Sequence, residues 1–186
     1  MTATADSGAP GALFAAYLGE KRPQIEAFLA ECAPACVAGT AEATRADLDR
    51  YLYQPLERFT ASGGKRTRPA LALLGCEAVG GDPAAALSTA AAIEYFQSAA
   101  LIHDDIADKS ELRRGEPCTY VTEGTGVAIN IGDLGLVSVL ALVLRDEKLP
   151  ADVRSDVAER LVQMALEGGG TDNVTVLLLG MEPTEG

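Results

Sequence analysis

LIHDDIADKSELRRG, residues 101–115, ends an apolar, alanine-rich run and then adds three aspartates and two arginines. On a helix, Asp104 and Asp108 lie one turn apart on the same face, and Asp105 lies about 100° round from Asp104. Mg²⁺ is usually held by one or two carboxylates, while phosphate oxygens and water fill its other positions. The stretch therefore predicts a helix that ends in a site for magnesium and a diphosphate.

Two physical features of this stretch favour a ligand over a solvated surface. The C-terminal end of a helix carries partial negative charge, so three aspartates there are unfavourable without a compensating cation. Arg113 and Arg114 follow, and the fork of a guanidinium group matches the oxygens of a phosphate. We therefore expect Mg²⁺ at the aspartates and phosphate at the arginines.

A second basic segment, Gly63-Gly-Lys-Arg-Thr-Arg-Pro69, precedes a predicted helix. Its glycines free the backbone, and a helix N-terminus with Lys65 and Arg68 beside it can hold a diphosphate without metal. A solvated basic turn is the alternative interpretation. The carboxylate cluster favours binding, because a metal site and a metal-free basic site together can hold two diphosphate esters.

Length and composition restrict the fold. The chain has 186 residues, which is enough for one domain with a sizeable core. Hydrophobic residues make up 48% of it, aromatic residues only 5%, and tryptophan is absent, so the core must be built from Ala, Leu and Val. This composition favours an all-α fold whose helices pack closely through small residues.

The formal net charge of −12 argues against a general surface for nucleic acid or for an anionic membrane. The N-terminus has no basic segment followed by an apolar core, so we expect no signal peptide. Polar residues and glycines interrupt the apolar run 127–144, which predicts no stable membrane insertion. The cysteines lack a paired spacing, and we interpret them as reduced thiols of a cytoplasmic protein. They are Cys32, Cys36, Cys76 and Cys118.

The chain divides into three segments. Residues 1–11 have the small, polar composition of a disordered lead. Residues 12–167 show helical periodicity, while 168–186 differ because 174–179 has the β-branched content of a short strand. Pro55 is expected to kink or split one helix. The predicted helices cover about 13–18, 23–33, 43–62, 69–79, 83–108, 126–144 and 150–167, and a loop is predicted over 115–124.

Four segments resemble, in order and with similar separations, the first half of the trans-prenyl diphosphate synthases, the polyprenyl synthetase family. They are GGKRTRP at 63–69, AAIEYFQSAALIHDDIAD at 91–108, SELRRGEP at 110–117 and GVAINIGD at 126–133. The resemblance implies an isoprenoid-synthase-like antiparallel helix bundle, here truncated. It also implies Mg²⁺-dependent condensation of isopentenyl diphosphate with an allylic diphosphate, a prenyltransferase reaction of isoprenoid biosynthesis.

The resemblance assigns the metal site. Asp104, Asp105 and Asp108 match the first aspartate-rich motif of the family, which would bind Mg²⁺ on the allylic diphosphate and act in catalysis. The metal would stabilise charge as it develops on the departing diphosphate. His103 lies beside the motif, and we interpret it as a structural residue or one that supports the ligands rather than as a general base.

The resemblance also assigns the substrate-binding residues. Lys65, Arg68 and Arg114 would bind isopentenyl diphosphate. Arg113 would bind the allylic diphosphate, and Gln97 stands where family members carry a His or Gln. These roles depend on the match of motifs, and the charges of the four cations suit them.

Small residues lie one turn before the aspartates, at Ala99 and Ala100. By resemblance they imply a deep product cavity and a geranylgeranyl or longer product. Ordinary tight helix packing is the alternative. Gly132-Asp133 matches a G-D pair of the family, which we interpret as a structural feature of a helix start rather than a ligand.

The sequence also departs from the family pattern. Members continue to a second aspartate-rich motif, which this sequence lacks, so the chain can be inactive as an enzyme. A non-catalytic, isoprenoid-diphosphate-binding subunit of a full-length synthase is therefore one alternative, and a homo- or hetero-oligomer is expected because an incomplete bundle exposes apolar faces. A fragment without independent function is another. Residues 165–179 resemble the C-terminal strand of metal-dependent Ser/Thr protein phosphatases, and no other segment does.

Overall fold

The computed structural model describes residues 10–36, 38–149, 151–152 and 156. Residues 1–143 form one unit and residues 144–186 another, and the elements that carry the candidate site all lie in the first. The predicted strand and the phosphatase-like segment lie outside the described residues, as does most of the predicted helix over 150–167.

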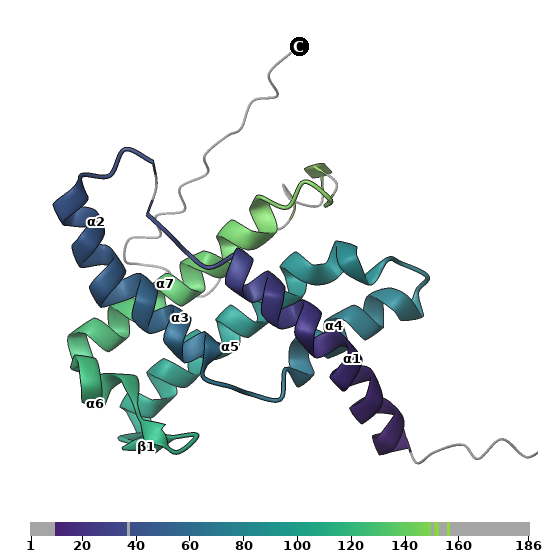
Figure 1. Ribbon diagram of the computed structural model, residues 1–186, viewed down its shortest axis with the longest axis horizontal. Coiled ribbons are helices and arrows are strands. Elements are labelled where there is room, and N and C mark those ends of the chain that lie inside the picture. Colours follow the sequence, from purple (N-terminus) through teal and green to yellow (C-terminus); the bar gives the residue numbers. More distant parts are fainter. Residues whose placement is uncertain (1–9, 37, 150, 153–155, 157–186) are drawn as a thin grey trace, which may run out of the picture. The chain divides into compact units, whose positions relative to one another are not determined.

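The described chain is mainly helical (Figure 1), as predicted. Its elements are α1 (Pro10–Glu31), α2 (Glu42–Leu48), the π-helical turn η1 (Asp49–Tyr53), α3 (Gln54–Ala61), α4 (Thr67–Ala78), the 3₁₀ turn η2 (Pro83–Ala86), α5 (Leu87–Asp108), the short strands β1 (Leu112–Arg113) and β2 (Glu116–Pro117), α6 (Thr119–Glu123) and α7 (Thr125–Leu144).

Helix α5 is the centre of this unit. It contacts α1, α3, α4 and α6. Alanines supply much of its buried surface, and they let neighbouring backbones approach closely. The buried alanines are Ala90, Ala91, Ala92 and Ala99. Alanine and leucine are thus core residues, as composition predicted, whereas isoleucine and tyrosine take the place predicted for valine among the buried residues described.

Helix α1 is one helix, although two were predicted. It begins at Pro10, inside the predicted disordered lead, and continues through Pro23. Proline removes one helical hydrogen bond, but Leu18, Ile25 and Leu29 share one face at helical spacing and pack in the same core. We infer that burying this continuous face outweighs the lost bond.

The break expected at Pro55 takes the form of a π-helical turn. Pro55 is the second residue of α3, and η1 directly precedes α3. Proline offers no amide to the carbonyl four residues earlier, so the regular hydrogen-bond pattern is interrupted there. The widened π turn continues the helical path from α2 to α3, where a kink or split was expected.

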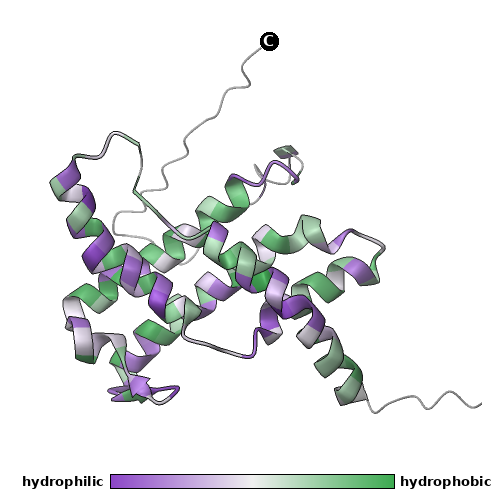
Figure 2. Cartoon of the chain, viewed as in Figure 1, coloured by the Kyte–Doolittle hydropathy of each residue, from purple (hydrophilic) through white to green (hydrophobic). Residues whose placement is uncertain are grey.

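Helix α7 is the most apolar element described, and Figure 2 shows the hydrophobic colour along most of it. Its best 18-residue window has a mean hydropathy of 2.2, so by length and composition alone it passes the test for a membrane span. Its polar residues and glycines therefore do not lower its hydropathy below that of a membrane span, and the absence of stable membrane insertion stays a prediction. Ala128, Ile131 and Gly135 are nonetheless buried, as in a helix that packs on a protein core.

Candidate functional site

The C-terminal end of α5 presents two exposed carboxylates. Asp104 and Asp108 are one turn apart, and the side chain of Asp104 is 55% exposed. Lys109 ends the helix in the left-handed conformation, with φ of 54°, and its amide caps the carbonyl of Ile106. The end of the helix therefore places two aspartates at the surface with a cation directly after them.

A hairpin follows where only a loop was predicted. Strands β1 and β2 pair antiparallel, and Arg114 and Gly115 form the turn between them. Both turn residues have positive φ, 56° and 87°, which matches the two-residue turn that suits a hairpin. The glycine after the two arginines was the available signal. The hairpin holds Arg113 on a strand, in reach of α5.

Arg113 binds the middle aspartate. Its Nε lies 2.7 and 2.9 Å from the two carboxylate oxygens of Asp105, and its Nη2 contacts Asp105 and lies 3.7 Å from Asp104. Asp105 is only 1% exposed. The hydrogen bonds that Arg113 donates to Asp105 raise the pKa of Arg113, so the guanidinium keeps its charge. Asp105 is thus engaged by protein in this structure.

Cys118 also adjoins Asp105, and sequence reasoning assigned it no role at the site. Its side chain is buried, and its amide bonds to the carbonyl of Glu111. Burial, followed by a hydrogen bond to Asp105, raises the pKa of the Cys118 thiol. The neutral thiol therefore donates to the same carboxylate that Arg113 clamps.

The donor chemistry at the end of α5 fits magnesium in a limited way. In the described part of the chain, no three His, Cys, Asp or Glu side chains converge as a metal site. Asp104 and Asp108 are exposed, and Mg²⁺ commonly takes one or two carboxylates together with phosphate and water. These two residues could hold the metal when a diphosphate supplies the remaining oxygens.

Arg114 joins the hairpin to the basic loop at 63–69. Its Nη1 donates to the carbonyl of Gly63 and lies 3.3 Å from the hydroxyl of Ser62, while its guanidinium lies 5.9 Å from the centre of the Phe59 ring. A Cβ on Gly64 would stand 3.3 Å from Nη2. Burial lowers the pKa of Arg114, and the charges of Arg66 and Arg113 add to this effect.

The cations of the basic loop differ in exposure. Lys65 and Arg68 are exposed, whereas Arg66 between them is buried. The loop leads into α4, which begins at Thr67 rather than at the predicted proline. Gln97 is half-buried on α5, two turns before Asp104 and on the same face. Two predicted ligand cations are thus accessible, and Arg114 is tied to their loop.

His103 packs against α7. Its Nε2 lies 3.3 Å from the carbonyl of Ile129 and 3.6 Å from Asp133, and a Cβ on Gly132 would be only 2.3 Å from that nitrogen. These contacts suit the structural interpretation of His103. Gly132 and Asp133 lie in the middle of α7, so their interpretation as a helix start was wrong.

Several residues close to the candidate site have strained backbone conformations. Among the described residues, the non-glycine residues with positive φ are Arg66, Lys109 and Arg114, with φ of 52°, 54° and 56°. Each is basic and borders the aspartates or the basic loop. Such conformations cost free energy, persist where surrounding contacts impose them, and often mark functional sites.

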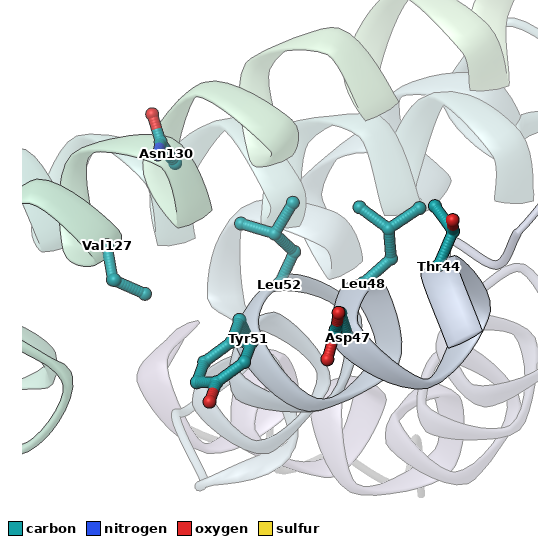
Figure 3. A pocket seen from close by; sticks show the side chains of 7 residues that line it. All are labelled: Thr44, Asp47, Leu48, Tyr51, Leu52, Val127 and Asn130. Carbon is teal, nitrogen blue, oxygen red and sulfur yellow. The ribbon is translucent and has the colours of Figure 1, made fainter.

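A pocket of about 300 Å³ lies elsewhere in the unit, and none of the predicted site residues lines it. Figure 3 shows Leu48 and Leu52 pointing from the α2–η1 segment toward α7. Its other lining residues are Thr44, Asp47, Tyr51, Val127 and Asn130. The charged groups described above therefore carry the candidate site, and this pocket does not.

Known proteins resemble this chain in sequence. The family model for polyprenyl synthetase matches residues 49–172. The short chain isoprenyl diphosphate synthase of Methanothermobacter thermautotrophicus is 42% identical over 123 residues, covering 65% of this chain and 38% of the relative. Farnesyl diphosphate synthase of Geobacillus stearothermophilus is 42% identical over 108 residues, covering 56% and 36%. The chain thus spans well under half the length of these curated relatives.

The fold is also that of solved isoprenyl diphosphate synthases. The crystal structure of geranylgeranyl pyrophosphate synthetase from Pyrococcus horikoshii matches with a TM-score of 0.69 and 33% identity, over 86% of this chain and 45% of that one. The family model covers about two thirds of the residues, including the aspartates and the hairpin. On these grounds the chain belongs to the polyprenyl synthetase family.

Proposed function

We propose that this chain binds Mg²⁺ and an allylic diphosphate and takes part in the condensation of isopentenyl diphosphate with that allylic partner. One observation carries the proposal. Arg114 bonds to the carbonyl of Gly63, which joins the basic loop to the hairpin whose Arg113 clamps the end of α5. A carboxylate site and a basic site, far apart in sequence, are thereby linked in one unit.

In the carboxylate site, we assign Asp104 and Asp108 as the magnesium ligands. Asp105 has a different role, because its buried carboxylate orients Arg113. The oriented guanidinium can then donate to the allylic diphosphate. Bound Mg²⁺ supplies charge stabilisation for the departing diphosphate.

In the basic site, Lys65, Arg68 and Arg114 bind isopentenyl diphosphate, with Gln97 as a further substrate contact on α5. The exposure of both loop cations supports this assignment. The net charge of the chain is −12, so a local cluster of cations is needed to attract an anion.

Product length is part of the proposal, and we propose a geranylgeranyl or longer product. Ala99 is buried, and a Cβ on Gly135 would stand 3.0 Å from its Cβ, so Ala99 serves close packing of α5 on α7. Ala100 is exposed on α5. Its small, accessible side chain supports the proposed product length better than Ala99 does.

We also propose a cytoplasmic location, which the thiols support. All four cysteines lie in the described residues and are free. Burial raises the pKa of Cys32 to about 11, and burial also raises that of Cys118, so both thiols are protonated and unreactive at neutral pH. Free, unreactive thiols suit a reducing compartment.

The metal site is tested by Asp104→Ala. In the native chain, farnesyl diphosphate with Mg²⁺ should raise the thermal unfolding midpoint, because a ligand that binds only the folded state stabilises it. In Asp104→Ala, most of that Mg²⁺-dependent shift should disappear, since one of two carboxylates is lost. Differential scanning fluorimetry with Mg²⁺ or with EDTA measures both.

Asp47→Ala is the matched control, because Asp47 is an exposed helical aspartate outside the proposed site. It should respond to farnesyl diphosphate like the native chain. Equal stabilisation of native and Asp104→Ala proteins would refute the metal site. Turnover is measured separately, by incorporation of labelled isopentenyl diphosphate.

A second candidate function is a non-catalytic, diphosphate-binding subunit that pairs with a full-length synthase. The apolar exposure of α7 favours it. Ile129, Leu136 and Val137 are each at least 38% exposed, on a strongly apolar helix of which only 28% of the best window is buried. Exposed apolar surface of this kind often marks an interface with another chain.

Sedimentation velocity tests the second candidate. We expect the chain to associate, either with itself or with an added full-length polyprenyl synthetase, because association covers the exposed face of α7. A cooperatively folded chain that stays monomeric both alone and in the mixture would contradict it.

A further inference from the structure

Arg66 occupies an unusual place for the middle cation of a basic loop. Its side chain is only 2% exposed, its Nη1 forms an ion pair with Glu94 of α5, and its Nη2 lies 2.7 Å from the carbonyl of Thr60 in α3. Glu26 of α1 lies 3.8 Å from its Nε. Arg66 thus ties the loop to three helices and is not available to a ligand.

The backbone of Arg66 is held in a conformation that its side chain must stabilise. Its φ is 52°, and it follows Gly63 and Gly64 with φ of 101° and 138°. A non-glycine residue in this region is strained and persists where its contacts over-determine it. The carbonyl of Arg66 also accepts from the amide of Ala70 in the first turn of α4. The buried ion pair therefore sets both the loop conformation and the start of α4.

The same loop presents the cations of the proposed diphosphate site. Lys65 directly precedes Arg66, and Arg68 follows it by two residues. The side chains of Lys65 and Arg68 are exposed. The carbonyl of Gly63 receives the hydrogen bond from Arg114. Because Glu94 neutralises Arg66, the charge left for an anion belongs to Lys65, Arg68 and Arg114. Turning the loop would move all three relative to one another.

We propose that the buried Arg66–Glu94 pair is a positioning device, which holds the strained loop so that Lys65, Arg68 and Arg114 converge on a metal-free diphosphate. This inference rests on the proposed function, since it concerns the isopentenyl diphosphate site. Arg66 and Glu94 touch no substrate. Their effect is to pre-organise three cations, which lowers the cost of ordering them on binding.

The test compares two ligands on one protein. Isothermal titration calorimetry measures isopentenyl diphosphate binding in EDTA and farnesyl diphosphate binding with Mg²⁺. In Glu94→Gln, whose side chain keeps its shape but loses its charge, we expect at least a tenfold weaker affinity for isopentenyl diphosphate. Affinity for farnesyl diphosphate should change less than twofold. General loss of structure would weaken both ligands alike.

A double variant distinguishes a loss of loop positioning from a general loss of the folded structure. Arg66→Met with Glu94→Met leaves no unpaired buried charge, and such apolar replacements are often well tolerated. We expect it to unfold cooperatively and to lose isopentenyl diphosphate affinity as Glu94→Gln does. Arg58→Met with Glu123→Met removes an exposed ion pair between α3 and α6 and should leave both affinities unchanged.

The outcomes separate the two proposals. Native chain that binds neither diphosphate contradicts the proposed function, and this inference fails with it. Native chain that binds both ligands, with unchanged isopentenyl diphosphate affinity in the folded double variant, overturns the positioning role alone. Equal weakening of both ligands in Glu94→Gln, with the fold retained, also overturns it.

Discussion

Arg113→Met should destabilise the chain by about 3 kcal/mol or more, because it leaves a buried carboxylate without a counter-charge. Asp105 is 1% exposed, and Arg113 contacts both of its oxygens. Removing one partner of a buried pair costs far more than removing an exposed pair. Urea unfolding followed by circular dichroism at pH 7 measures the change in free energy of unfolding.

Two variants make this prediction specific. Arg58→Met breaks an exposed ion pair with Glu123, and it should cost less than about 1 kcal/mol. Asp105→Asn, added to Arg113→Met, removes the stranded charge and should restore a substantial part of the lost stability. A loss below about 0.5 kcal/mol in Arg113→Met would show that Asp105 does not depend on this arginine.

Much of the fold could be predicted from periodicity and punctuation. Both ends of α4 and α7 and the C-terminal end of α5 agree with glycine, proline and apolar spacing to within about two residues, which is the usual uncertainty of helix boundaries. The start of α5 lies four residues after the predicted one, because 83–86 form the 3₁₀ turn η2. The errors have tertiary causes. Pro23 does not end α1, because the residues on both sides of it share one buried face. Local propensity cannot include the free energy of packing against a distant helix.

The sequence names the candidate site residues, whose roles stay predictions, but it could not reveal how their surroundings differ. Asp104, Asp105 and Asp108 look equivalent in the sequence, whereas in the structure Asp105 is buried and the other two are exposed. That separation depends on Arg113, which a hairpin returns to α5, and on Cys118 beyond it. Contacts between segments set such differences, and spacing along the chain does not reveal them.

The basic loop shows the same limit. Lys65, Arg66 and Arg68 look alike in sequence, and only Arg66 is buried. One signal was available, since Glu94 is the only acidic residue in the apolar stretch 87–103 that precedes the aspartates, and a buried carboxylate requires a partner. Choosing Arg66 as that partner requires the three-dimensional path of the loop.

Gly132→Ala, at the contact between α5 and α7, should have the second large effect on the free energy of unfolding. We expect a loss of about 2 kcal/mol, because the added Cβ would stand 2.3 Å from Nε2 of the half-buried His103 ring and overpack the contact between the two helices. Helix propensity alone would predict a gain in stability, because it favours alanine over glycine inside a helix. The measurement is again the free energy of unfolding in urea.

Gly75→Ala is the matched control, since Gly75 is exposed within α4 and a Cβ there would meet nothing within 4 Å. It should stabilise the chain by about 0.5–1 kcal/mol. His103→Ala should make Gly132→Ala less costly, because the clashing ring is gone, so the two changes should not add. If Gly132→Ala stabilises the chain as Gly75→Ala does, the close packing of His103 on α7 is refuted. Non-additivity would instead support the interpretation of His103 as a structural residue, which packs the aspartate-bearing helix α5 against α7.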